Sequence, residues 1–269
     1  WNLRPIEDSH RWEEYRQIVS NILDAIHFME SFGGVDSEEL NNIEFFTSHE
    51  ALHLPYEQAL TRQDPTTGNW YNLGAHMVWL GERTRNIDGA HVEYASGITN
   101  PIGVKVGPSI SRDTLLQLIE KLNPQDRPGR LTLITRLGAQ NVETVLPELI
   151  QAVRDSGRTV VWSCDPMHGN TISVDGSPGT TNGKRKTRRF DEILQELRST
   201  FLVHRELDNV IAGVHFELTG DDVTECTGGA VDLQDGDLSR NYQTYCDPRL
   251  NESQSLEMAF LLSTLLRSE

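Results

Sequence analysis

Short apolar runs alternate along the chain with longer stretches in which apolar residues recur at helical spacing. The runs are mostly rich in β-branched or aromatic residues, and several are flanked by Gly or Pro, which is typical of buried parallel strands. They cover residues 43–46, 76–80, 102–106, 131–135, 159–164 and 212–216. Helical patterns follow most of them, at roughly 83–97, 111–122, 142–155, 188–205 and 253–267. This alternation predicts right-handed βαβ units around a parallel sheet.

Polar side chains gather at the ends of these runs. Glu82, Lys105, Arg136, Asp165 and Glu217 all lie in or just after a predicted strand. Active sites of (β/α)8 barrels are built at the C-terminal strand ends, so this distribution favours a TIM-type barrel over an open sheet. No Gly-x-Gly-x-x-Gly follows the first run, which argues against a dinucleotide-binding sheet. A closed barrel needs eight strands, so two strands are not accounted for among the six candidates.

The chain of 269 residues suits a single barrel domain over 1–269. Residues 1–40 predict an N-terminal helical segment that leads into the first strand, with Trp12, Val19 and Ile26 at helical spacing. Residues 173–186 are rich in Gly, Ser, Thr, Pro and Asn and end in Lys-Arg-Lys, which predicts a flexible insertion loop. This loop is either a solvated insertion or a basic lid over a phosphate.

Composition narrows the classes of partner. The net charge of −16 argues against a nucleic-acid surface and against docking on anionic lipid. No apolar run approaches the roughly 20 residues that span a bilayer, so no membrane association is expected. The three cysteines do not form a disulfide framework, which favours a reducing compartment. We therefore expect a cytoplasmic protein, or a plastid one if a transit peptide preceded the segment.

Three motifs offer metal-ligating side chains. They are DPMHGN at 165–170, HFE at 215–217 and CDPRLN at 246–251. His168, Glu217 and Asp247 supply one imidazole and two carboxylates, a mixed set that suits Mn²⁺, Fe²⁺, Co²⁺ or Zn²⁺. Each also has a structural alternative: His168 could cap a turn, and Glu217 could pair with an arginine. Asp247 precedes a proline, where aspartate is common as a turn residue.

Cations lie within or just after three of the predicted strands. Arg83 and Arg85 lie in GERTR at 81–85, Lys105 in GVKVGP at 103–108, and Arg136 in TRLG at 135–138. On a barrel, cations at successive strand ends converge and could hold a phosphate or a carboxylate. The alternative is that they pair with barrel carboxylates. Arg85 could also face solvent on the following helix.

Taken in order, these and further motifs resemble the class II (plant-type) 3-deoxy-D-arabino-heptulosonate 7-phosphate (DAHP) synthases over nearly the whole chain. The matching stretches are TSHEAL (47–52), HMVW (76–79), GERTR (81–85), DGAHV (88–92), PGRLT (128–132), DPMHGNT (165–171), VTEC (223–226) and CDPRLN (246–251). Several are six or more residues long, which makes them highly specific. The resemblance implies a (β/α)8 barrel that condenses phosphoenolpyruvate with erythrose 4-phosphate, the first step of the shikimate pathway.

The resemblance also implies roles for particular residues. His168, Glu217 and Asp247 match the family's metal ligands, with Mn²⁺ expected first and Co²⁺, Fe²⁺ or Zn²⁺ as alternatives. The substrate residues that it implies are Lys105 and Arg136, which bind phosphoenolpyruvate and take part in catalysis, with Arg83, Glu82 and the wall residue Trp79. We also expect a homo-oligomer.

The chain departs from the family's pattern at its start. The first two family strands, with a cysteine ligand, an arginine for phosphoenolpyruvate and a Lys-Pro-Arg-Ser segment for erythrose 4-phosphate, would precede Trp1. The resemblance therefore covers strands 3 to 8 of the family barrel. On this basis we expect the chain to be either a fragment of a longer protein or a shortened homologue. Two alternatives follow: a truncated or partner-dependent barrel without activity alone, or a metal-dependent lyase or hydrolase acting on another phosphorylated substrate.

Overall fold

The computed structural model describes residues 44–175 and 184–267 and a few helical positions before them (Trp12, Glu13, Arg16, Gln17, Val19, Ser20 and Leu23). Most of the predicted N-terminal segment 1–40 lies outside the described residues. The chain divides into two compact units. We call Phe46–Asn170 with Gln195–Phe216 the sheet unit. We call Trp1–Phe45, Thr171–Leu194 and Glu217–Glu269 the hairpin unit.

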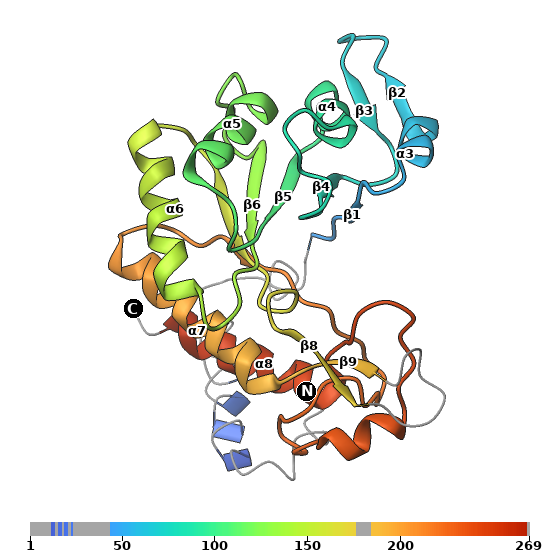
Figure 1. Ribbon diagram of the computed structural model, residues 1–269, viewed down its shortest axis with the longest axis vertical. Helices are drawn as coiled ribbons and strands as arrows, with labels where there is room; N and C mark the ends of the chain where they lie inside the picture. The colour runs from blue at the N-terminus through green and yellow to red at the C-terminus, as the bar shows by residue number, and fades with distance from the viewer. Residues whose placement is uncertain are drawn as a thin grey trace. The chain divides into compact units, whose positions relative to one another are not determined.

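A six-stranded parallel sheet organises the sheet unit and curls as half of a barrel would (Figure 1). Its strands, in spatial order, are β1 (Ser48–Glu50), β4 (Met77–Leu80), β5 (Ile102–Val106), β6 (Leu131–Thr135), β7 (Val161–Cys164) and β10 (Gly213–Val214). The spatial order follows the chain order, as predicted for successive βαβ units. The α/β prediction is thus confirmed, whereas closure into an eight-stranded barrel stays a prediction.

The two faces of this sheet bury different residues, because successive strand side chains point to opposite sides. One face, which carries Val104 and Leu133, packs into an apolar core with helix residues such as Leu115. The other face carries Trp79 and Ile134 and lines a hollow of about 230 Å³. The cations predicted at the strand ends, Lys105 and Arg136, are not among the residues that line this hollow.

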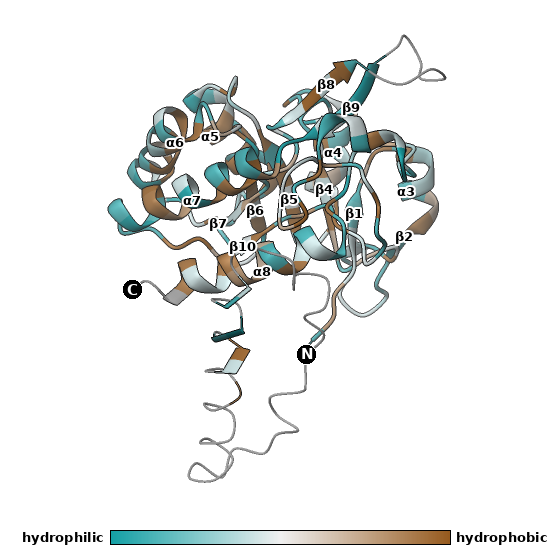
Figure 2. Cartoon of the chain, turned by 90° about the horizontal axis from the view of Figure 1, so that it is seen from below, coloured by the Kyte–Doolittle hydropathy of each residue, from teal (hydrophilic) through white to brown (hydrophobic). Residues whose placement is uncertain are grey.

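Helices α4 (Ala90–Gly97), α5 (Arg112–Leu122) and α6 (Val142–Ser156) follow β4, β5 and β6 (Figure 1). Ser111 caps α5 by accepting a hydrogen bond from the Thr114 backbone N–H at 3.1 Å. Helix α6 ends at Gly157, whose positive φ of 67° suits glycine. Figure 2 shows hydrophobic stretches alternating with hydrophilic ones along α5 and α6, as expected for helices that cover one face of a sheet.

The strand predicted at 43–46 is wrong. Residues 44–47 form no strand, and β1 begins at Ser48 instead. Phe45 and Phe46 are exposed, so their hydrophobicity does not mark a buried strand. The pattern also failed to predict helix α3 (Leu54–Leu60) and the small antiparallel pair β2 (Thr61–Gln63) and β3 (Trp70–Asn72), which are inserted between β1 and β4.

The hairpin unit is built on the antiparallel strands β8 (Thr171–Asp175) and β9 (Lys184–Arg188). The loop predicted at 173–186 therefore gives its two ends to strands, while residues 176–183 lie outside the described part. Helix α7 (Phe190–Glu206) begins in this unit, which also holds the short η3 (Asp235–Ser239) and α8 (Glu252–Arg267). Val19 from the N-terminal stretch packs against Phe260 of α8.

None of the helices in the described part of the chain has the length and the apolar content needed to cross a membrane. All three cysteines are free: Cys164 and Cys226 are buried and Cys246 is exposed.

Candidate active site

Asp165 is the centre of a buried charged cluster at the C-terminal ends of β5 and β7. Its Oδ2 accepts a hydrogen bond from Lys105 Nζ and lies 2.7 Å from Nδ1 of His168. Its Oδ1 accepts the backbone N–H groups of Met167 and His168 at 3.0 and 3.1 Å. Asp165 is fully buried and Lys105 is only 5% exposed, so the ion pair is shielded from water. The structure therefore brings Lys105 and His168 together through one carboxylate.

The charge of Asp165 fixes the protonation of its neighbours. Burial alone would raise the pKa of Asp165, but the hydrogen bond with His168 and the positive charge of Lys105 together hold it well below its ordinary value. An ionised carboxylate only accepts hydrogen bonds, so Nδ1 of His168 carries the proton. In the neutral imidazole the lone pair then resides on Nε2. Metal-ligating histidines commonly show this pairing with a carboxylate.

Two aromatic rings lie near this cluster, on the face of the sheet that carries Trp79 and Ile134. The ring of Trp79 lies 5.9 Å from Lys105 Nζ and meets the ring of His215 edge-on, with centroids 5.1 Å apart. Both rings line the 230 Å³ hollow. Gly103 makes room for Trp79, because a Cβ at this position would lie 2.8 Å from Trp79 Cβ. The predicted wall residue thus lies beside the predicted substrate cation.

Arg136 begins a loop that is tied to the loop carrying His168. Its Nη2 donates to the backbone carbonyl of His168, and its own N–H donates to the carbonyl of Val106 at 2.8 Å. The backbones of Gly138 and Gly169 approach so closely that a Cβ on Gly169 would lie 2.4 Å from the Gly138 nitrogen. Glycine is required there, and the two loops form one rigid support.

Glu196 of α7 supports both loops from beneath. Its carboxylate accepts the Leu137 backbone N–H and the Asn170 side-chain amide, each at 2.7 Å. Asn170 also accepts the Ala139 N–H at 3.0 Å. Burial raises the pKa of Glu196 to about 7 against the pull of these donors, and the negative charge of Asp165 adds to the rise.

The two arginines of the GERTR motif differ from expectation. Arg85, which was expected to be the more solvent-facing, is the more buried one, and it donates to Glu82 at 2.5 Å. Glu82 also accepts the Gly107 backbone N–H at 2.7 Å. Arg83 is exposed. The fixed charge pair therefore involves Glu82 and Arg85, and Arg83 is the arginine with access to solvent.

Glu217 and Asp247 belong to the hairpin unit, whereas His168 belongs to the sheet unit. Within the hairpin unit, Arg188 donates to the carboxylate of Glu217, and Lys186 donates to Asp247 at 2.8 Å. The alternative role for Glu217, pairing with an arginine, is thus present. The basic end of the predicted loop contacts a carboxylate of its own unit.

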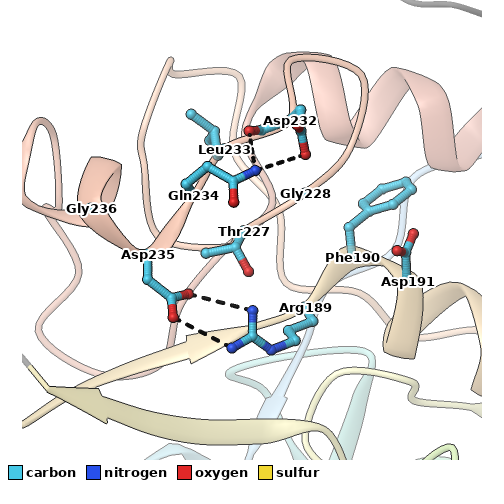
Figure 3. A pocket seen from close by; sticks show the side chains of 10 residues that line it. All are labelled: Arg189, Phe190, Asp191, Thr227, Gly228, Asp232, Leu233, Gln234, Asp235 and Gly236. Atoms are coloured by element: carbon cyan, nitrogen blue, oxygen red, sulfur yellow. Dashed lines mark hydrogen bonds and ion pairs between the residues drawn. The ribbon is translucent and has the colours of Figure 1, made fainter.

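A separate polar hollow of about 440 Å³ lies in the hairpin unit, and Figure 3 shows the residues that line it. Arg189 and Asp235 pair within it at 3.4 Å. Gln234 donates to the Asp232 carboxylate at 2.9 Å. None of the described residues that line this hollow is a predicted site residue, so we assign it no part in the site.

Four residues with clear structural roles were not assigned from the sequence: Asp165, His215, Glu196 and Arg188. Asp165 directly follows β7 inside the DPMHGN motif, which is a signal that could have singled it out. Glu196 and Arg188 lie in ordinary amphipathic or basic stretches. Their roles depend on residues far along the chain, which periodicity does not reveal.

Comparison with known proteins agrees with the resemblance. A model of the class-II DAHP synthetase family matches residues 1–263. The chain is 49% identical over 269 residues to the phospho-2-dehydro-3-deoxyheptonate aldolase of Streptomyces coelicolor. It is 47% identical to the protein of the same name from Neurospora crassa, and all of the chain and 58% of each relative are covered. A probable chloroplastic one from Catharanthus roseus is 46% identical, with 98% of the chain and 50% of the relative covered. The chain thus spans 50–58% of the length of these relatives.

Proposed function

The chain belongs to the class-II DAHP synthetase family, and from this premise we propose that it condenses phosphoenolpyruvate with erythrose 4-phosphate to DAHP. This reaction is the first step of the shikimate pathway and of aromatic amino acid biosynthesis. The observation that carries the proposal is the buried Lys105–Asp165–His168 cluster at the strand ends. The cluster supports the proposal because the Lys105 ammonium and the His168 imidazole both contact the Asp165 carboxylate, so a cation lies near a histidine whose Nδ1 proton is fixed.

The proposed metal ligands are His168, Glu217 and Asp247. The donor set fits a divalent ion, because one imidazole and two carboxylates suit Mn²⁺, with Co²⁺, Fe²⁺ and Zn²⁺ as alternatives. The contact of Asp165 with Nδ1 supports the assignment, since it leaves the Nε2 lone pair of His168 for coordination. The chemistry supplied by such an ion is Lewis-acid polarisation of the aldehyde oxygen of erythrose 4-phosphate.

Phosphoenolpyruvate is bound by Lys105 and Arg136, with Arg83 and Glu82 beside them and Trp79 as a wall. Lys105 supplies a point charge, and Arg136 supplies a planar donor pair for a phosphate or carboxylate. Both are held by contacts described above, so little reorganisation is required when the substrate binds.

In the reaction, C3 of phosphoenolpyruvate forms a bond to the aldehyde carbon. Positive charge develops at C2, where water adds, and inorganic phosphate leaves. The residues of the chain orient C3 against the aldehyde and neutralise the phosphate. In this proposal the Lys105 ammonium, which Asp165 holds in an ion pair, stabilises the negative charge of the substrate.

A phosphate-release assay with added Mn²⁺ tests the proposal, with each substrate omitted in turn. Turnover that needs both substrates is expected, and His168→Ala should abolish it. The matched control is His53→Ala, because His53 is an exposed histidine at the start of α3 and makes no side-chain cap hydrogen bond. Confirmed metal binding without any phosphate release would reject the activity for this chain, and normal turnover in His168→Ala would reject the ligand.

Two alternatives have distinct outcomes in the same experiment. The edge strands β1 and β10 each pair with one neighbour in the described sheet, so a barrel completed by a partner chain would gain activity only when that chain is added. A lyase or hydrolase would release phosphate with another substrate and without erythrose 4-phosphate. We further propose that the protein forms a homo-oligomer. We also propose a cytoplasmic location, or a plastid one if a transit peptide preceded the segment.

A further inference from the structure

Arg188 is a fully buried arginine at the end of β9, next to the segments that carry two of the proposed metal ligands. Its backbone is fixed on both sides, because it pairs in register with Thr171 of β8 and its carbonyl accepts the Thr227 N–H at 2.9 Å. The side chain is 0% exposed. A buried guanidinium is costly unless charged and polar partners surround it.

The guanidinium touches both ligand segments. Nη1 donates to the Glu217 carboxylate and to the backbone carbonyl of Pro248, the residue after Asp247. Nε donates to Thr171 Oγ1 at 2.9 Å, which fixes the plane of the group. One planar cation therefore holds the carboxylate of one proposed ligand and the turn of the other.

The backbone joins the same two segments independently. The Leu250 N–H donates to the Glu217 carbonyl at 2.9 Å, and the Thr219 N–H donates to the Leu250 carbonyl at 2.9 Å. This ladder fixes the spacing of the segments but leaves the side-chain torsions of Glu217 undetermined. The contact with Arg188 supplies that orientation.

Nη2 of Arg188 is buried and has no hydrogen-bond partner among the described residues. Leaving a buried donor unsatisfied is energetically costly. An arginine whose only role was to stabilise the hairpin unit would be expected to satisfy this donor as well. The observation favours a placement set by the Glu217 carboxylate and the Pro248 turn.

We infer that Arg188 is a positioning residue, which orients Glu217 and the Asp247 turn for a divalent cation. This inference rests on the proposed function, because it takes Glu217 and Asp247 as ligands. Outer partners that orient metal ligands typically change metal affinity by roughly 10–100-fold when they are replaced. Arg188 has no contact with substrate in this assignment and acts through the ligands alone.

A calorimetric titration of the full chain with Mn²⁺ alone tests the inference without an activity assay. Arg188→Met is expected to weaken Mn²⁺ binding by roughly 10–100-fold. Arg188→Lys keeps the charge and loses the planar fork, so an intermediate loss is expected. If Arg188→Met does not fold, the lysine variant carries the test, with thermal unfolding as the check on folding.

The matched control is Arg189→Met, which removes the neighbouring arginine, a half-exposed one that pairs with Asp235 in Figure 3. Its Mn²⁺ affinity is expected to equal that of the unchanged chain. If Arg188→Lys binds Mn²⁺ as tightly as the unchanged chain or more tightly, the inference is overturned. If the unchanged chain binds no Mn²⁺, the proposed ligand set itself fails, and the two failures are therefore distinguishable.

Discussion

The sheet unit and the hairpin unit hold their proposed ligands with buried charges of opposite sign. In the sheet unit the buried charge is the carboxylate of Asp165, which contacts Lys105 and His168. In the hairpin unit it is the guanidinium of Arg188, which contacts Glu217. Each buried charge matches its ligand: an anion fixes the proton of an imidazole, and a cation fixes the orientation of a carboxylate. The chemistry of each proposed ligand therefore determines the sign of the buried charge that supports it.

The supports also differ in regularity. Asp165 follows a strand of a parallel sheet, and its partner Lys105 lies within another strand of that sheet. Glu217 and Asp247 lie on irregular segments joined by an isolated bridge between Leu218 and Leu250. The sheet unit can thus rely on its core for placement, whereas the hairpin unit depends more on individual side chains. We expect substitutions in the sheet unit to affect stability most.

The largest effect is expected from Asp165→Asn. This change leaves the buried Lys105 ammonium without a counter-charge, and breaking a buried ion pair costs about 3–5 kcal/mol of unfolding free energy. Chemical denaturation measures the loss. Asp155→Asn is the control, because Asp155 is exposed and its ion pair with Arg112 is long, at 3.7 Å. A loss below about 1 kcal/mol in Asp165→Asn would show that the sheet unit does not depend on its buried anion.

The next effect concerns pH and Glu196. Its pKa rises from 4.5 to about 7 in the folded chain, so the folded state holds a proton that the unfolded state releases. The stability contribution is therefore present below pH 4.5 and is lost as pH rises through about 7. The difference between these two pKa values corresponds to about 3 kcal/mol of unfolding free energy. In Glu196→Gln this loss should disappear, as measured by denaturation from pH 4 to 8; parallel curves for the two proteins would contradict it.

Much of the sheet unit could be predicted because its signals are local. The strands at 102–106 and 131–135 coincide with β5 and β6, since each is an apolar run with clear ends. Lys105 was identified by the same logic, as a cation inside such a run. The strand prediction at 43–46 was wrong because Phe45 and Phe46 are apolar but exposed, so their hydrophobicity does not indicate a buried strand.

The charged supports could not be predicted because their partners are distant in sequence. Lys105 and Asp165 are 60 positions apart, and Arg188 lies 29 positions from Glu217. Periodicity gives the face of an element but not which charge lies opposite. For the same reason the sequence could not tell which arginine of GERTR is paired, and the structure reverses the expectation for Arg85.

A smaller effect should separate the two GERTR arginines. Arg85→Met removes the partly buried partner of Glu82 and should lower the unfolding free energy by about 1–3 kcal/mol. Arg83→Met should change stability by less than about 0.5 kcal/mol, because Arg83 is exposed. Its effect is expected on the KM for substrate instead. Equal stability losses in the two variants would remove the distinction between a supporting and a substrate-facing arginine.

The smallest effect is expected from Lys186→Met, which tests whether burial or contact with a ligand decides the importance of a cation. Lys186 contacts Asp247 much as Arg188 contacts Glu217, but its side chain is 54% exposed. An exposed pair contributes about 0–1 kcal/mol, because water competes for both charges. Denaturation should therefore show almost no loss for Lys186→Met, and any loss should shrink further in added salt. Arg188→Met is measured in the same denaturation experiment. An equal loss of unfolding free energy in the two variants would mean that contact with a proposed ligand, rather than burial, sets the strength of these supports.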